Sequence, residues 1–454
     1  MTFTSWPFVA FVAATFALYY LPILRRWQVH ILLLASLFFY GTLQPDTLPL
    51  LAAAIFATYF FLGMAMRRRD VWLPAGIAFN LVLLAFFKYK FLFMDVATPS
   101  LSGNGAMDVL LKLPLPIGIS FFIVHNIGLL ADLAGRDGAA PRMRDVFLHI
   151  IFFPQLVAGP ITRTGDFLSQ IKPKFVADIA YVEAAKWLVS GYFFKLFVAN
   201  NLNQITSNME FPLYVKLTLI NRWICIFLYS YHIYADFFGY SAIAIGMALL
   251  FGYRLPPNFN LPYISVSFAQ FWSRWHISFS TWLRTHLYIP LGGNRHGTAR
   301  TYFNLMLAMA LGGLWHGAAI GYLAWGLLHG LFLVAERPLL SRIDGPPNAA
   351  GPRFPIQAVR ACAVFFCVSM AWILFKLPNL EHAIDYLSGM FVEGDIDRPY
   401  HLYRSLALLY ALPVFLHHVV PRPRASLEPF LYGAMATLML VDAGPISPFI
   451  YFQF

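Results

Sequence analysis

Apolar windows long enough to cross a membrane recur along the whole chain. A transmembrane helix needs about 20 mostly apolar residues. Such windows begin near Ser5, His30, Leu48, Trp72, Leu115, Ala185, Leu217, Phe237, Thr301, Leu323, Ile356, Leu402 and Phe430. The pattern predicts an all-α polytopic membrane protein with roughly a dozen membrane segments, some of them re-entrant or tilted.

The sequence has no long polar linker, so we expect a single membrane domain over residues 1–454. The run GPPNAAGPRFP at 345–355 is the best internal boundary, and we interpret it as a connection between helices. The first apolar run lacks a basic leader and a cleavage site, so it should stay as a helix. Arginines follow the first and third runs, at 25–26 and 67–69, which places the N-terminus outside the cytoplasm by the positive-inside rule.

Composition agrees with a membrane protein. The chain is 59% hydrophobic and 12% charged, with a mean hydropathy of +0.64. Lys and Arg next to an anionic leaflet account for the net charge of +11 without a nucleic-acid partner. Cys225, Cys362 and Cys367 lie in apolar runs without CxxC spacing, so we interpret them as packing residues.

Two stretches do not look like ordinary spanning helices. FFPQLVAGPITR at 152–163 has Pro and Gly inside an apolar segment, which predicts a broken or re-entrant element. FAQFWSRWHISFSTWLRTHLYIPLGGNRHG at 268–297, taken as a helix, has Trp272, Trp275, Phe279 and Trp282 on an aromatic face. Arg and His recur elsewhere in the stretch, so we expect it at the membrane interface or along a cavity, with GGNRHG as its exit loop.

Two histidines without other ionisable neighbours stand in GGLWHGAAIGYLAWGLLHG, residues 312–330. His316 follows Trp315 and is flanked by glycines, which permit close helix approach or a substrate near the backbone. A histidine that bonds a neighbouring helix is an equal alternative. His329 comes thirteen residues later, so the two do not share a helix face. HExxH and Cys/His clusters are absent from the sequence, so we expect no metal, and no GxSxG elbow supports a serine hydrolase.

A histidine acting as general base is the remaining chemistry, because its pKa is suited to taking a proton from a hydroxyl. His276, beside Arg274 and Trp275, is a candidate to hold a carbonyl, a second substrate group or the base itself. Asp236 in YHIYADFFGYSA is a third candidate at membrane depth. A structural ion pair of Asp236 with Arg274 or another arginine is at least as good an interpretation.

The segments YADFFGYSAIAIG, NFNLPYISVSFAQFWSRWHISFSTWLRTHLYIPLGGNRHG and LGGLWHGAAIGYLAWGLLHG, in this order, resemble the membrane-bound O-acyltransferase family. LPLPIGISFFIVHNIGLLAD, FFPQLVAGPITR and VSMAWILFKLPNLEHAIDYLSGMF also fit, so the resemblance covers about residues 72–392. It implies a helical bundle around a central pore, with re-entrant and interfacial helices and an active site deep in the membrane.

The resemblance assigns the family's essential histidine to His316 and its second characteristic histidine to His276. Trp315, Arg274, Trp275 and Asp236 are our candidates for substrate binding, and the resemblance leaves His329 as a packing or pore-lining residue. Near relatives usually have asparagine where this chain has Ala319, and a second arginine where it has Ser273. Both departures concern details of the donor or acceptor contacts.

The resemblance implies transfer of an acetyl group from cytoplasmic acetyl-CoA to hydroxyls of an exported polysaccharide such as alginate. It also implies a bacterial inner-membrane location and a periplasmic acetyltransferase or SGNH-like partner. Acetyl-CoA is then a donor substrate, and we expect no permanently bound cofactor. The alternatives are transfer of D-alanyl or another short acyl group to an envelope polymer, a secondary transporter or flippase without acyl chemistry, and a scaffold for a periplasmic transferase.

Overall fold

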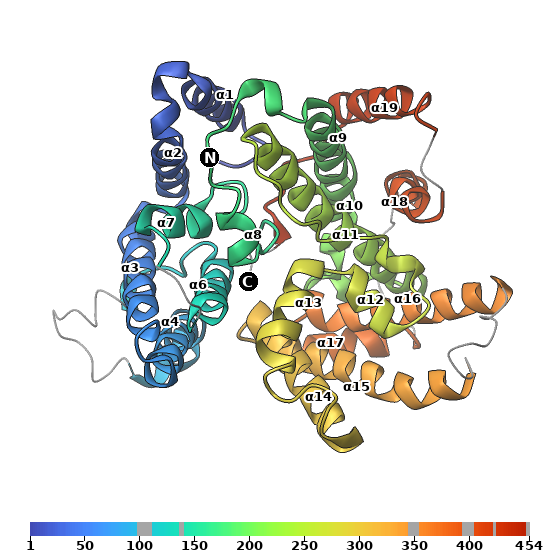
Figure 1. The fold of residues 1–454 in the computed structure, drawn as a ribbon. Coiled ribbons are helices and arrows are strands. Elements are labelled where there is room, and N and C mark those ends of the chain that lie inside the picture. Colours follow the sequence, from blue (N-terminus) through green and yellow to red (C-terminus); the bar gives the residue numbers. More distant parts are fainter. Residues whose placement is uncertain (98–110, 136–139, 344–353, 393–403, 421–423, 451–454) are drawn as a thin grey trace. The chain divides into compact units, whose positions relative to one another are not determined.

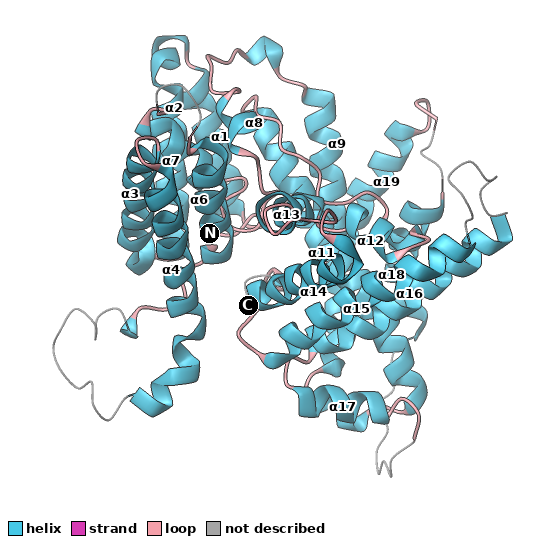
Figure 2. Ribbon diagram, turned by 60° about the horizontal axis from the view of Figure 1, so that its bottom comes forward, coloured by secondary structure: helices cyan, strands magenta, loops and turns pink. Residues whose placement is uncertain are grey.

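The computed structural model describes residues 1–97, 111–135, 140–343, 354–392, 404–420 and 424–450. In these ranges the chain forms helices joined by loops and turns, without a strand (Figures 1 and 2). The all-α fold expected from the apolar windows is therefore confirmed. The proposed boundary at 345–355 falls mostly on residues 344–353, which lie outside the described ranges.

The chain divides into two compact units. Unit 1 comprises Met1–Leu188 and Ser241–Pro256, and unit 2 comprises Val189–Tyr240 and Pro257–Phe454. The prediction of one domain over 1–454 stays a prediction. The helices up to the end of unit 1's first segment are α1 (Trp6–Tyr20), α2 (Gln28–Leu43), α3 (Leu48–Ala65), α4 (Arg69–Ala97), α6 (Ile119–Leu133), α7 (Met143–Ile151), α8 (Thr164–Leu168) and α9 (Tyr181–Tyr192), the last of which continues into unit 2.

Unit 1 buries an aromatic core and presents apolar side chains outward. The rings of Phe8, Phe39 and Phe153 pack together, with centroids 5.7 to 6.4 Å apart. Phe38 and Phe60 on α2 and α3 are more than half exposed. Outward-facing phenylalanines on helices of this apolarity are what a lipid-embedded helix requires.

Within the described ranges, four helices are long and apolar enough to cross a membrane: Pro45–Ala65, Arg69–Lys90, Leu219–Leu250 and Pro355–Lys376. A further pair, Trp6–Tyr20 and Pro22–Leu43, passes the same test together and is bent by 98°. Pro22 begins the second member of this pair, where its missing N–H and fixed φ suit a helix start. Most predicted windows coincide with helices, although several of these helices are short or interrupted.

The helices and helical turns of unit 2 follow one another with few long loops. They are η4 (Phe193–Ala199, a π-helix), α10 (Asn200–Thr206), α11 (Leu219–Leu250, which continues into unit 1), α12 (Phe268–Arg274), α13 (Ile277–Leu283), η8 (Arg284–Tyr288, a π-helix), α14 (Gly297–His316), α15 (Ile320–Ile343), α16 (Phe354–Lys376), α17 (Leu380–Ser388), α18 (Arg404–Val419) and α19 (Glu428–Val441). Short 3-10 turns lie between them: η5 (Ser207–Met209), η6 (Leu213–Lys216) and η7 (Pro262–Ile264).

The structure corrects one predicted segment start and confirms one predicted break. The windows near Leu217 and Phe237 are a single helix, α11, of 32 residues. The separate start at Phe237 is wrong because the backbone stays helical without a break from Leu219 to Leu250. The 152–163 segment has no helix, and residues 152–162 are all buried, as the prediction of a broken element requires.

Candidate active site

A tightly packed helical hairpin in unit 2 positions His316. It is the last residue of α14, and Gly317 follows in an extended conformation with φ −166°. A Cβ on Gly313 would lie 2.2 Å from the carbonyl oxygen of Tyr322, and one on Gly326 would lie 2.3 Å from that of Met309. The glycines therefore bring α14 and α15 into backbone contact, one of the two roles that the sequence left open for them.

The imidazole of His316 lies in an aromatic compartment. Its ring centroid is 5.0 Å from Trp315, 5.3 Å from Trp325 and 5.2 Å from Phe375. All three rings meet it at steep angles, between 73° and 89°. His316 is 4% exposed, so bulk water has little access to the ring in this structure. An imidazole enclosed in this way suits a base that must act where water is excluded.

His276 lies at a break in the aromatic stretch. It has φ 43° and ψ 52°, the left-handed region, between α12 and α13. The next N–H, on Ile277, donates to the carbonyl of Asn258 at 2.9 Å, and the Ser278 hydroxyl donates to the side chain of Asn258 at 2.6 Å. The prediction of one unbroken helix from Phe268 to the GGNRHG exit loop is therefore wrong, because the Ile277 N–H bonds the carbonyl of Asn258 instead of continuing a helix.

A pair of stacked rings connects the two histidines. Phe279 stacks on Trp315 with centroids 4.2 Å apart. Phe279 lies 5.1 Å from His276 and 6.0 Å from His316, and Trp315 lies 6.1 Å from His276. The structure therefore brings His276, Trp315 and His316 together, as the sequence-based site required. Their catalytic and binding roles stay predictions.

Trp275 and Arg274 sit beside this group but contact different elements. The Trp275 ring packs against Phe259 and Trp372, each 5.0 Å away. The Arg274 guanidinium donates to the carbonyl of Leu261 at 3.4 Å, and the Arg274 carbonyl accepts from the N–H of Asn260 at 3.0 Å. These contacts hold the backbone on either side of the helix break at His276. They do not test the predictions that Arg274 and Trp275 bind substrate.

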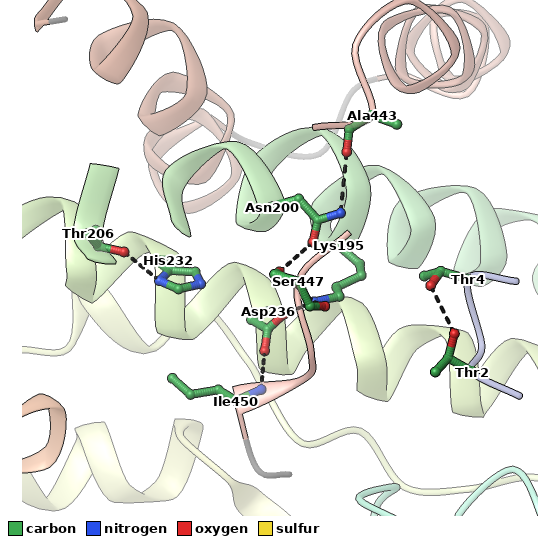
Figure 3. Close-up of polar contacts among 10 residues, drawn as sticks. All are labelled: Thr2, Thr4, Lys195, Asn200, Thr206, His232, Asp236, Ala443, Ser447 and Ile450. Carbon is green, nitrogen blue, oxygen red and sulfur yellow. Dashed lines mark hydrogen bonds and ion pairs between the residues drawn. The ribbon is translucent and has the colours of Figure 1, made fainter. Parts of the chain in front are cut away.

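Asp236 pairs with a lysine rather than with an arginine. Its Oδ1 lies 2.6 Å from Nζ of Lys195, and its Oδ2 accepts from the N–H of Ile450 at 2.8 Å (Figure 3). The expected ion pair with Arg274 or another arginine is thus wrong in its partner. Lys195 interrupts the apolar run GYFFKLFVAN, which was the available signal. Whether Asp236 binds substrate stays a prediction.

Trp325 lies between His316 and His329. Trp325 is 5.3 Å from His316 and 4.9 Å from His329, so it separates the two imidazoles. His329 also meets Trp272 at 5.2 Å and is fully buried. Within the described ranges, no group of three or more His, Cys, Asp or Glu side chains is placed to hold a metal ion.

Sequence comparison gives this geometry a context. Residues 34–376 match the membrane-bound O-acyltransferase family. A protein named as a probable alginate O-acetylase from Pseudomonas putida is 33% identical over the full length of both chains. Its counterpart from Azotobacter vinelandii is 37% identical over 87% of this chain and 79% of the relative. A peptidoglycan O-acetyltransferase from Helicobacter pylori is 34% identical over 79% of this chain and 73% of the relative.

Proposed function

This chain belongs to the membrane-bound O-acyltransferase family, and we propose that it transfers an acetyl group from cytoplasmic acetyl-CoA to hydroxyls of an exported polysaccharide such as alginate. In this proposal the acetyl group reaches the polymer directly or by way of a periplasmic partner protein. The names of the relatives support acetyl transfer to an envelope polysaccharide. Family membership makes the chain an O-acyltransferase, so a transporter without acyl chemistry is no longer a competing interpretation.

The reaction needs one base and careful placement, because a thioester is already activated. His316 takes the proton from the hydroxyl that accepts the acetyl group, which belongs to the polymer in direct transfer and to the partner in relayed transfer, and the resulting oxygen attacks the thioester carbonyl. The C–O ester bond forms as the C–S bond breaks, and the imidazolium gives the proton to the leaving thiolate, which restores the neutral imidazole. Placement and general base catalysis together supply most of what such a transfer requires.

The observation that carries this proposal is the enclosure of His316 at the end of α14. The hairpin glycines fix its backbone, and three aromatic rings within 5.3 Å fix its imidazole. His276 is linked to it through Phe279 and Trp315. In the proposal, His276 holds the carbonyl or orients the base, and Trp315 lines the acyl site.

The direct test is acetyl transfer by membranes that contain the wild type or His316→Ala together with the neighbouring proteins of the system. Radiolabelled acetyl-CoA is the donor, and label in exported polysaccharide is measured at equal abundance of folded protein. We expect His316→Ala to lose about 10²- to 10⁴-fold in rate, the usual contribution of a general base. His382→Ala is the matched control, because that ring stacks on Phe211 of the same unit and contacts neither candidate histidine.

The possible outcomes separate the chemistry from its location. Unchanged transfer by folded His316→Ala would move the chemistry to the partner and leave this chain as a conduit or scaffold. Label from D-alanine but not from acetyl-CoA in the polymer would keep the acyltransferase and change its donor. Label that enters the polymer without a periplasmic partner would make the transfer direct.

A further inference from the structure

We propose that Asp236 is a positioning residue. With Lys195 it holds the 442–450 segment against α11, and Phe449 of that segment supports Phe237, the ring that contacts the His276 imidazole. The inference rests on the proposed role of His276 in acyl transfer. It goes beyond that role because it assigns work to residues far from both histidines in the sequence. Figure 3 shows the polar half of the arrangement.

The ion pair is buried, and the segment completes its hydrogen bonding. The side chains of Lys195 and Asp236 are 6% and 1% exposed. Nζ of Lys195 also donates to the carbonyl of Ser447 at 3.1 Å and to its hydroxyl at 3.3 Å. Asp236 accepts from the N–H of Ile450. Since a buried charge needs more than its counter-ion to offset desolvation, both charges depend on this segment.

The chain that leads into the pair is tied down as well. The side chain of Asn200 donates to the carbonyl of Ala443 at 3.3 Å, and its oxygen accepts from the hydroxyl of Ser447 at 2.8 Å. Asn201 donates to the carbonyl of Asp442 at 3.4 Å. Side chains of α10 therefore bind the backbone of a segment that has no regular structure to satisfy it.

Local structure explains why Lys195 reaches Asp236. Lys195 lies in the π-helix η4, the kind of irregular turn that often marks a functional position. Gly239 of α11 faces it, and a Cβ there would lie 2.8 Å from the backbone nitrogen of Lys195 and 2.9 Å from the carbonyl oxygen of Gly191. The glycine in YADFFGYSA thus permits the close approach that brings the lysine to the aspartate.

The apolar half of the segment connects the pair to His276. Phe449 stacks on Tyr240 with centroids 4.2 Å apart and lies 6.0 Å from Phe237. Phe237, the neighbour of Asp236 on α11, meets the His276 imidazole edge-on at 4.7 Å and 90°. Phe449 is 3% exposed, so the segment forms a packed wall behind Phe237. Loss of the segment's anchor would therefore free the ring that limits the motion of His276.

Phe449→Ala tests the apolar link in the full-length protein with its native partners. We expect kcat for acyl transfer to fall by about tenfold to about 100-fold, the range that small misplacements of reacting groups produce. We expect KM for the acyl donor to stay within a factor of about two, since Phe449 contacts no donor in the proposal. Phe449→Leu keeps part of the volume and should give an intermediate kcat.

Phe39→Ala is the matched control for a cavity in a core. Its ring neighbours Phe8 and Phe153 belong to unit 1, so it should lower stability and leave kcat per folded molecule unchanged. A wild-type kcat in both folded Phe449 variants would overturn the inference. A fall of kcat in Phe39→Ala as large as that in Phe449→Ala would overturn it too, because any core cavity would then have the same effect.

An ion-pair exchange tests the polar link. Lys195→Asp with Asp236→Lys keeps both charges buried but leaves no N–H donor for the Ser447 carbonyl and no acceptor for the Ile450 N–H. Asp236→Asn leaves the buried Lys195 ammonium without its counter-ion and should lower kcat. We expect kcat of the double variant to stay as low as that of Asp236→Asn. Recovery to the wild-type kcat would overturn the inference, because the pair would then act only by neutralising charge.

His276→Ala separates this inference from the proposed function. If that variant keeps full transfer, the proposed role of His276 is wrong and the inference falls with it. If His276→Ala is inactive while both Phe449 variants have wild-type kcat, the proposed function stands and only the inference is wrong.

Discussion

Gly313→Ala should disturb the active-site hairpin more than its chemical size suggests. The added Cβ would lie 2.2 Å from the carbonyl oxygen of Tyr322 and 3.1 Å from Cα of Gly326. A carbon and a carbonyl oxygen in contact are about 3.3 to 3.6 Å apart, so the two backbones must separate by about 1 Å. Both neighbours are backbone atoms, which cannot rotate away. The hairpin as a whole must therefore shift.

The magnitude follows from two opposing effects. Overpacking of this kind costs about 1 to 3 kcal/mol. Alanine in place of glycine within a helix contributes about 0.5 to 1 kcal/mol in the other direction. The difference is a net loss of up to about 2.5 kcal/mol in the free energy of unfolding. His316 lies three residues further along α14, so a shift of about 1 Å should also reduce transfer by about 100-fold.

Thermal unfolding of the purified protein and labelled acyl transfer per folded molecule measure the two effects. Gly433→Ala is the matched control, since that glycine lies in α19 with no atom within 4 Å of an added Cβ. It should unfold at or above the wild-type temperature and transfer normally. Gly326→Ala, whose Cβ would meet the Met309 carbonyl at 2.3 Å, should behave like Gly313→Ala. If both hairpin variants match the wild type, close backbone contact does not position His316.

Three further outcomes are expected. Phe279→Ala removes the ring stacked 4.2 Å from Trp315 and should lower the free energy of unfolding, measured by denaturation, by about 3 to 5 kcal/mol. Acyl transfer per folded molecule should also fall, and unchanged transfer would contradict the link between the two histidines. Glu336→Ala removes the carboxylate that accepts N–H bonds at the start of α12 and should lower the free energy of unfolding by about 1 to 3 kcal/mol. The exposed Glu183→Ala should lower it by about 0 to 1 kcal/mol, and equal shifts in melting temperature would refute the capping role of Glu336. His276→Gly should be more stable than His276→Ala by about 1 kcal/mol, because only glycine adopts φ 43° freely, and the reverse order would exclude backbone strain there.

The hydrophobic pattern predicted the helices well because a membrane imposes a length and a polarity that are visible in sequence. Windows beginning near Ser5, His30, Leu48 and Trp72 correspond to helices that begin at Trp6, Gln28, Leu48 and Arg69. The Pro and Gly content of the 152–163 segment likewise predicted its broken backbone. In both cases the cause is local, so a local pattern indicates it.

Two of the three errors, the unbroken aromatic helix and the partner of Asp236, have long-range causes. The aromatic spacing favours one helix from Phe268 up to the GGNRHG exit loop, but the carbonyl of Asn258 accepts a hydrogen bond from the N–H of Ile277. The cation for Asp236 lies 41 residues earlier, and the N–H on its other oxygen lies 214 residues later. Which distant groups meet depends on how the helices pack, and neither hydropathy nor spacing contains that information.

The same distinction applies to the two candidate histidines. His316 is held by its own hairpin, whose glycines stand within fourteen residues of it in the sequence. His276 adopts a backbone conformation that costs about 1 to 3 kcal/mol for a side chain other than glycine. This conformation persists because the carbonyl of Asn258 accepts from the N–H of Ile277 and because Phe237 packs against the His276 imidazole. The geometry of His276 therefore depends on the rest of unit 2. Substitutions in that unit that are distant from both histidines should lower acyl transfer by displacing His276 before they displace His316.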